Sequence, residues 1–275
     1  MGHRGEVREL RQSLVRFYDA TLGRPSRRNR WLVEESLRAI CRDLEALEAS
    51  VSLREMSRDL EALRATVALY STVQFRLPLP PMGGWAIGPD FACELVREII
   101  RRRPRAILEL GTGASTLVSG YALEMGGGGK IVSVEHQMEY SSLSALNIKD
   151  HQLGDTAQVI HAPLKDVVIG GETFPWYDPS CFPQDRLFDM LIVDGPPGHL
   201  RPLARYPALP MLMKALTPDA IIVLDDANRP DEVSIIDRWD REYGPFAVEL
   251  RSTRTGMAIL RRGEGEASSD ASLGS

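Results

Sequence analysis

The sequence has 275 residues, 33 of them Lys or Arg and 38 Asp or Glu, a formal net charge of −5 at pH 7, and 43% hydrophobic residues. These values predict a globular protein with one main domain and an added segment, or two small domains, and they give no general case for nucleic-acid binding. No stretch approaches the run of about 18 apolar residues that a membrane span requires.

The chain begins with a segment, residues 1–30, that we expect to be basic and flexible. Its "RPSRRNR" run, Arg24–Arg30, fits a solvated linker, with contact to phosphate or another anionic surface as the alternative. The segment has no apolar signal region, and the three cysteines, Cys41, Cys93 and Cys181, are scattered without a paired spacing. Both features favour a reducing, cytoplasmic location.

Residues 31–80 form a second segment, which we expect to be helical. An apolar seam at alternating steps of four and three runs through Val33, Leu37, Ile40, Leu44, Leu47 and Val51. After a shift near Ser52 the seam resumes at Leu53, Met56, Leu60, Leu63 and Val67. The shift fits a helical hairpin or one bent helix, which either packs on the main domain or forms a homodimer through a coiled coil.

Residues 81–262 are the predicted main domain. A connector rich in Pro and Gly leads into a helix that we expect to begin with Asp90 as its N-cap. From Arg105 onward strands alternate with helices, and we expect the strands at 106–110, 130–135, 157–162, 188–194, 220–225, 246–250 and 256–260. Because these strands are apolar on both faces, they predict a Rossmann-like, doubly wound, mostly parallel α/β sheet. The tail, residues 263–275, is small and polar, and we expect it to be disordered.

The stretch "ILELGTGAST" joins the first strand to the following helix. Gly111 and Gly113 allow a sharp turn and a close approach to a ligand, and the helix start near Ser115 offers free N–H groups. A dinucleotide fold would have a small residue at position 116, where this chain has Thr116. Glu109 is unhelpful for a pyrophosphate but suits a ligand that carries an ammonium group.

This stretch resembles the first motif of the class I S-adenosylmethionine-dependent methyltransferases, an acidic residue followed by two glycines. The resemblance spans roughly Gly83 to Arg261, and it implies a seven-stranded sheet whose last strand is antiparallel. It also implies that S-adenosylmethionine is the cofactor. The implied contacts around this motif are Glu109, Gly111, Thr112, Gly113 and Ser115.

Further cofactor contacts are expected at the ends of the second and third strands. Glu135 ends the second strand and can accept hydrogen bonds from both ribose hydroxyls, as the family's acid at this position does; a solvated strand end is the alternative. His136 next to it lines the pocket or lies on the surface. Ala162 and Pro163, at the end of the third strand, are expected to form the adenine pocket, unless they are only a strand exit.

Three carboxylates follow the fourth and fifth strands: Asp194 in "LIVDGPP", and Asp225 and Asp226 in "IIVLDD". Neighbouring parallel strands bring their carboxyl ends to within about 5 Å of one another. Like charges at that distance repel, so we expect a divalent cation with oxygen ligands, Mg²⁺ first and Mn²⁺ or Ca²⁺ as alternatives. For Asp226, a helix cap or a loop acid is the alternative interpretation.

The carboxylate arrangement resembles the metal-dependent O-methyltransferases, in which such acids hold Mg²⁺ against two neighbouring hydroxyls of the acceptor. The resemblance implies Asp194, Asp225 and Asp226 as metal ligands, with Asp194 also beside the cofactor. The catechol type has a lysine base where this chain has Pro197, so the expected base is His199, Asp194 itself or water. We expect His199, Arg201, Arg205 and Tyr206 to lie on the acceptor side.

The sequence therefore predicts S-adenosylmethionine-dependent, metal-assisted O-methylation of a hydroxylated small molecule or sugar. One alternative is an NAD-dependent oxidoreductase, against which Glu109 and Thr116 argue. The other is a non-catalytic Rossmann-like assembly protein that dimerises through its N-terminal helices. The acceptor itself is not readable, because the aromatic "FPWYDPSCFP" loop, residues 174–183, fits either an acceptor wall or a cap on the core.

Overall fold

The computed structural model describes residue 53, residues 56–84 and residues 86–262. The chain divides into two units between residues 61 and 62. The predictions for residues 1–30, for the seam from Val33 to Val51 and for the tail 263–275 lie outside the described residues. Within the described part, no helix is both long enough and apolar enough to cross a membrane.

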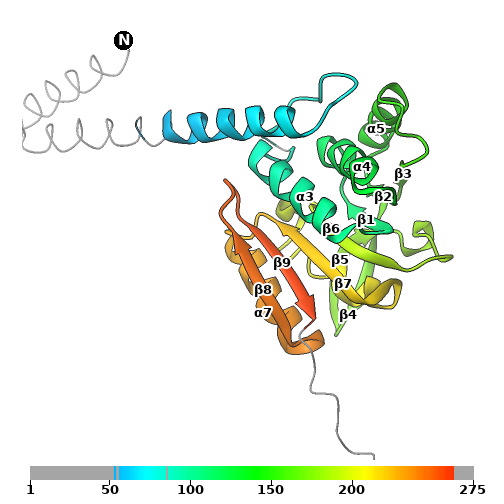
Figure 1. The fold of residues 1–275 in the computed structure, drawn as a ribbon. Helices are drawn as coiled ribbons and strands as arrows, with labels where there is room; N and C mark the ends of the chain where they lie inside the picture. Colours follow the sequence, from blue (N-terminus) through cyan, green and yellow to red (C-terminus); the bar gives the residue numbers. More distant parts are fainter. Residues whose placement is uncertain (1–52, 54–55, 85, 263–275) are drawn as a thin grey trace, which may run out of the picture. The chain divides into compact units, whose positions relative to one another are not determined.

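A seven-stranded sheet forms the centre of the second unit (Figure 1). Its strands are β1 (Ala106–Leu110), β2 (Lys130–Glu135), β3 (Ala157–His161), β6 (Phe188–Val193), β7 (Leu216–Asp225), β8 (Phe246–Arg251) and β9 (Met257–Arg262). They lie in the order β3-β2-β1-β6-β7-β9-β8, and β9 runs antiparallel to both of its neighbours. The predicted mostly parallel seven-stranded sheet with an antiparallel last strand is therefore confirmed.

The sheet separates two hydrophobic cores because successive residues of each strand point to opposite faces. In β1, for example, Ile107 packs into one core and Leu108 into the other. Three helices cover the Ile107 face, namely α3 (Pro89–Arg102), α4 (Ala114–Gly126) and α5 (Met138–Asp150). The Leu108 face is covered by α6 (Ala208–Leu212), α7 (Pro230–Tyr243) and a two-stranded hairpin.

That hairpin, β4 (Leu164–Ile169) and β5 (Glu172–Tyr177), shows that residues 174–177 of the expected loop 174–183 belong to a strand. Gly170 and Gly171, both with positive φ, form its turn. The aromatic side chains of β5, Phe174, Trp176 and Tyr177, are fully buried, so this segment covers the core.

Two other local predictions are wrong. Gly88, and not Asp90, is the N-cap of α3, because Pro89 already occupies the first helical turn. The second concerns the start of β7: α6 is only five residues long, and a 3₁₀ turn, Met213–Ala215, leads from it directly into the strand. β7 consequently starts four residues earlier than its apolar run at residue 220 indicated.

A helix over residues 56–72 precedes the connector. Leu69 and Val73 are buried in the core that contains Ile107. The residues at the seam spacing are instead exposed to solvent: Leu53, Met56, Leu60, Leu63, Val67 and Tyr70. Within the second unit, Leu69 of this helix is thus in the core, whereas none of the described residues buries Leu63, Val67 or Tyr70.

Candidate functional site

Four neighbouring parallel strands end in one row. The register aligns Leu110 with Val134 and with Val193, and Val193 with Leu224. The residues that come next along these strands are Gly111, Glu135, Asp194 and Asp225. In open α/β sheets this carboxyl edge is where ligands bind.

Glycine is present at two positions after β1 for two different structural reasons. Gly111 has a φ of 98°, its N–H donates to the carbonyl of Val134 at 2.9 Å, and a Cβ there would lie 3.2 Å from the Asp194 carbonyl oxygen. Gly113, the N-cap of α4, has a φ of 145°, and a Cβ there would meet no atom within 4 Å. Gly111 is therefore needed for packing, whereas Gly113 leaves open space beside the backbone at a helix N-terminus.

Glu109 is fully buried beneath this loop. Its Oε2 accepts hydrogen bonds from the Thr116 hydroxyl at 2.5 Å and from the Ser133 hydroxyl. Its Oε1 is buried and has no hydrogen-bond partner among the described residues. Burial raises the pKa of Glu109, an effect that the hydroxyls of Ser133, Thr116 and Ser115 oppose. An unpaired buried acceptor favours a ligand that brings a donor.

Glu135 is buried at the end of β2, on the neighbouring strand. Its Oε1 accepts from the backbone N–H of Gln137 at 2.8 Å, and Nδ1 of His136 lies 2.8 Å from the same oxygen. These contacts hold the carboxylate at the strand end, in the row that begins at Gly111.

The predicted adenine-pocket residues follow β3. Ala162 is buried and donates its N–H to the Glu135 carbonyl at 2.8 Å, which ties the two strand ends together. Pro163 is exposed, and its carbonyl accepts from the N–H of Asp178. The remaining predicted contacts, Thr112 and Ser115, flank Gly113 at the start of α4.

The three aspartates predicted to converge do so. Asp194, Asp225 and Asp226 each offer one carboxylate oxygen within 4.8 Å of the other two. Asp225 Oδ1 accepts from the Thr255 hydroxyl at 2.8 Å and from the Asp226 N–H at 2.6 Å. Asp226 has a φ of 61°, an uncommon backbone conformation for a residue other than glycine, which bends the chain directly after β7.

Arg205 supplies positive charge inside this cluster. The side chain is only 5% exposed, and its Nη2 lies 3.2 Å from Asp194 Oδ1 and 2.9 Å from Asp226 Oδ2. Its Nη1 donates to the Asp225 carbonyl at 3.1 Å, and its Nε lies 3.9 Å from Glu232. Arg205, which we expect on the acceptor side, is thus held by carboxylates inside the fold, and its position relative to an acceptor stays a prediction.

The cluster keeps an excess of negative charge. With Glu232 included, its four carboxylates face two guanidinium groups, those of Arg205 and of Arg229, whose Nη1 lies 2.8 Å from Asp226. If all are ionised, two negative charges remain. Burial raises the pKa of Asp194, which Arg205 opposes, and burial together with Asp226 raises the pKa of Asp225 to about 6.

The other residues expected on the acceptor side are dispersed. Tyr206 is buried, and its hydroxyl donates to Glu242 at 2.5 Å. Arg201 reaches the β4–β5 hairpin, where its guanidinium lies 3.6 Å from the ring centre of Phe174. His199, in the 3₁₀ turn Gly198–Leu200, is exposed and is not among the side chains that converge with the three aspartates.

Two further residues lie at the same edge: Gly195, which sequence reasoning missed, and Tyr177, which it named only as part of the aromatic stretch 174–183. Tyr177 is fully buried, its hydroxyl has no partner among the described residues, and a Cβ at Gly195 would collide with that hydroxyl. The aromatic ring of Tyr177 lies 6.2 Å from that of His136. The Asp-Gly-Pro-Pro sequence of this loop was the only local signal for Gly195, and the aromatic composition of residues 174–183 was the only one for Tyr177.

Comparison with known proteins gives one family match. A family model described as a methyltransferase domain matches residues 108–227. Among curated proteins, none matches this sequence significantly.

Several solved structures are similar to this chain. The SAH-bound methyltransferase PaMTH1 of Podospora anserina is 15% identical, with a TM-score of 0.50 over 73% of this chain and 88% of that chain. A methyltransferase from Geobacter sulfurreducens is 12% identical, with a TM-score of 0.51 over 76% of this chain and 96% of that chain. The O-methyltransferase from Bacillus cereus in complex with SAH is 14% identical, with a TM-score of 0.49 over 91% of this chain and 97% of that chain.

Because the sequence identities are this low, the similarity to the Podospora anserina and Geobacter sulfurreducens structures shows a shared fold only. The family match covers the segment from the middle of β1 to just beyond β7, which contains the whole row of strand ends and the three aspartates. The match over residues 108–227 and the shared fold together show that this chain resembles the class I S-adenosylmethionine-dependent methyltransferases.

Proposed function

We propose that this protein transfers the methyl group of S-adenosylmethionine to an oxygen of a hydroxylated small molecule or sugar, assisted by a divalent cation. The observation that carries the proposal is the row Gly111, Glu135, Asp194 and Asp225 at one sheet edge. It combines an open glycine backbone with strand-end acids beside a three-carboxylate cluster.

The residues present suit the cofactor. The open backbone at Gly113 leaves room for the methionine part, and the unpaired Oε1 of Glu109 is a buried acceptor close below that loop. Glu135, held by Gln137, is the proposed acceptor for the ribose hydroxyls. Asp194 lies next to Gly111, and its carboxylate can stabilise the sulfonium or the amino group of the cofactor.

The residues present also suit a divalent cation. Three carboxylate oxygens within 4.8 Å of one another form a donor set of the kind that Mg²⁺ prefers, and when all the acids are ionised they outnumber the guanidinium groups of Arg205 and Arg229. Asp194, Asp225 and Asp226 would hold the ion, which would lower the pKa of an acceptor hydroxyl when bound. Arg205 supplies part of the same charge from within the chain.

The transfer itself requires little from the protein beyond alignment. The acceptor oxygen forms a bond to the methyl carbon as the carbon–sulfur bond breaks, which leaves S-adenosylhomocysteine and a methyl ether. The hydroxyl proton passes to a base. Asp194, 19% exposed and with a raised pKa, and His199, exposed in the adjacent turn, are the two proposed bases.

Thermal unfolding with S-adenosylhomocysteine or NAD tests the cofactor. We expect S-adenosylhomocysteine, and not NAD, to raise the unfolding temperature, because bound ligand stabilises only the folded state. The reverse result would favour an oxidoreductase.

The assembly alternative rests on the exposed seam of the helix over residues 56–72. Leu63 and Val67, each 59% exposed, continue the three-and-four spacing from Leu60 to Tyr70. A coiled-coil homodimer would cover this seam. Light scattering of the full chain should give a dimer that Leu63→Glu with Val67→Glu dissociates, whereas Ala68→Glu, also exposed, leaves it intact. A monomer at high concentration would remove the proposal without affecting the enzymatic one.

A cytoplasmic location is proposed from the cysteines. Cys93 and Cys181 are free thiols in the described part of the chain. Free thiols are typical of proteins in a reducing compartment. Localisation of the tagged full-length protein by cell fractionation tests this.

A further inference from the structure

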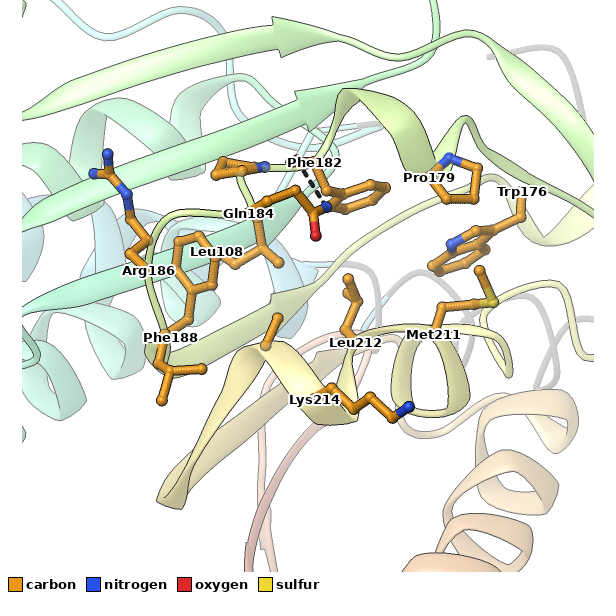
Figure 2. Close-up of a pocket in the computed structure, with 13 residues that line it drawn as sticks. Leu108, Trp176, Pro179, Phe182, Gln184, Arg186, Phe188, Met211, Leu212 and Lys214 are labelled. Atoms are coloured by element: carbon orange, nitrogen blue, oxygen red, sulfur yellow. Dashed lines mark hydrogen bonds between the residues drawn. The ribbon is translucent and has the colours of Figure 1, made fainter.

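A cavity of about 340 Å³ lies on the Leu108 face of the sheet, between the segment that follows β5 and helix α6 (Figure 2). Apolar side chains form most of its wall: Leu108, Trp176, Phe182, Phe188, Met211 and Leu212. This volume is within the range of small-molecule sites, which begins at roughly 300 Å³.

The crossover from β3 to β6 explains why this cavity exists. Parallel strands are usually joined by a helix that covers the sheet. Here Pro175, Pro179 and Pro183, spaced four residues apart, prevent a continuous helix, and the chain forms a hairpin, a short 3₁₀ turn and a loop instead.

The cavity is separate from the row of strand ends. None of its lining residues belongs to the glycine loop or to the carboxylate cluster. Phe188 is the first residue of β6, whereas Asp194 follows the last one, so the cavity extends toward the opposite end of that strand. A ligand there would be a second ligand, additional to the cofactor.

Two buried tryptophans show that the cavity wall offers an unused hydrogen-bond donor. Trp176 and Trp239 are both fully buried. Nε1 of Trp239 donates to the Tyr206 carbonyl at 2.9 Å, whereas Nε1 of Trp176 has no partner among the described residues. In Figure 2 the indole of Trp176 faces the hollow beside Met211. A buried donor without a partner is costly, so an acceptor atom in the cavity would be favoured.

The polar part of the lining has a net positive charge. The guanidinium of Arg186 is already held by Asp185, with contacts of 3.0 and 2.8 Å. Lys214 is exposed and has no carboxylate partner in the described part of the chain. It lies in the 3₁₀ turn Met213–Ala215, directly after α6, and it lines the cavity together with Met211 and Trp176.

We propose that this cavity binds a small amphipathic carboxylate, with its apolar body against Phe182, Phe188 and Leu212 and its carboxylate between Trp176 Nε1 and Lys214. An aliphatic or aromatic body of roughly ten carbon atoms matches a site at the lower end of the usual volume range. The proposal does not depend on the methyl-transfer reaction.

The test uses decanoate, below its micelle concentration, and the full-length protein with ¹⁵N-labelled tryptophan. We expect a saturable shift of one indole N–H resonance, the one that is missing in Trp176→Phe, while the resonance of Trp239 stays in place. Equal shifts of all indole resonances, or no shift, would overturn the proposal. Competition with S-adenosylhomocysteine would also overturn it, because the ligand would then be at the strand ends.

Matched variants separate the two polar contacts. Lys214→Met should weaken decanoate binding at least about tenfold, and Lys149→Met, an exposed lysine on α5, should not. Decanol should bind wild type and Lys214→Met alike. Decanol binding to wild type as tightly as decanoate would show that no carboxylate is recognised. The Lys214 variant keeps the proposal testable if Trp176→Phe fails to fold.

Discussion

The guanidinium of Arg205 lies 2.9 Å from the carboxylate of Asp226 in a site where both side chains are less than 10% exposed. The same nitrogen lies 3.2 Å from Asp194. Buried carboxylates at this edge are thus held together by a cation from the chain itself. This relationship determines what removal of either charge should do.

Replacing Arg205 with Met should destabilise the protein by about 3–5 kcal/mol, because it leaves several buried carboxylates without their counter-charge. Arg229→Met is the matched control: Arg229 contacts the same Asp226 but is 51% exposed, so its loss should cost about 1 kcal/mol or less. Urea unfolding in EDTA measures both. We expect Mg²⁺ to restore part of the stability of Arg205→Met; equal losses in the two variants would contradict a central role for Arg205.

Replacing Asp225 with Asn should remove the dependence on divalent cations while leaving S-adenosylhomocysteine binding nearly unchanged. The reason is that Asp225 belongs to the carboxylate cluster but not to the glycine loop. Calorimetric titrations with Mg²⁺ and with S-adenosylhomocysteine separate the two effects. Asp237→Asn, exposed on α7, serves as control. Full activity of the unmodified protein in EDTA would count against the cation.

Replacing Gly113 with Ala should weaken S-adenosylhomocysteine binding by at least about tenfold, the factor that corresponds to 1.4 kcal/mol. The control is Gly127→Ala, at the other end of α4. Both glycines have positive φ and open space where a Cβ would lie, so Gly127→Ala shows what a strained substitution at an end of α4 costs, about 1–2 kcal/mol in the left-handed region. Gly113, with φ 145° and ψ −134°, lies closer to the region that only glycine adopts readily, so the stability of each variant is measured beside its affinity. Isothermal titration calorimetry measures the affinity of each variant for S-adenosylhomocysteine. If both variants lost the same affinity, Gly113 would not face the cofactor.

His151 should make the protein less stable in mild acid. Burial lowers the pKa of His151 from 6.5, and its Nδ1 lies 2.8 Å from the Tyr121 hydroxyl. The stability linked to a lowered pKa is present above pH 6.5 and is lost as the pH falls through the folded-state value. His151→Gln should therefore reduce the loss of stability between pH 7.5 and pH 5. Unfolding curves with the same pH dependence in both proteins would show that other groups cause it.

Much of the fold follows from local sequence. The strands of the parallel sheet are apolar on both faces and separated by helical stretches, and this pattern led to β1, β2 and β6 with bounds within one residue of those observed. The hairpin of β4 and β5 was not predicted, because its strands are held by pairing with each other and by burial of Phe174, Trp176 and Tyr177 against the sheet. Those are contacts between segments, which propensity does not encode.

The sequence by itself determined which functional residues follow which strand. A glycine loop follows one strand, an acid follows the next, and three aspartates follow two others. Their convergence follows because the carboxyl ends of neighbouring parallel strands share one edge. Only the tertiary structure decided what lies between the aspartates. Arg205 is eleven residues beyond Asp194 and twenty before Asp225 in the chain, and no periodicity marks it as buried. The fold can bury Arg205 because the carboxylates of Asp194 and Asp226 compensate its charge. Whether this attraction outweighs the cost of removing the charges from water depends on their distances in space.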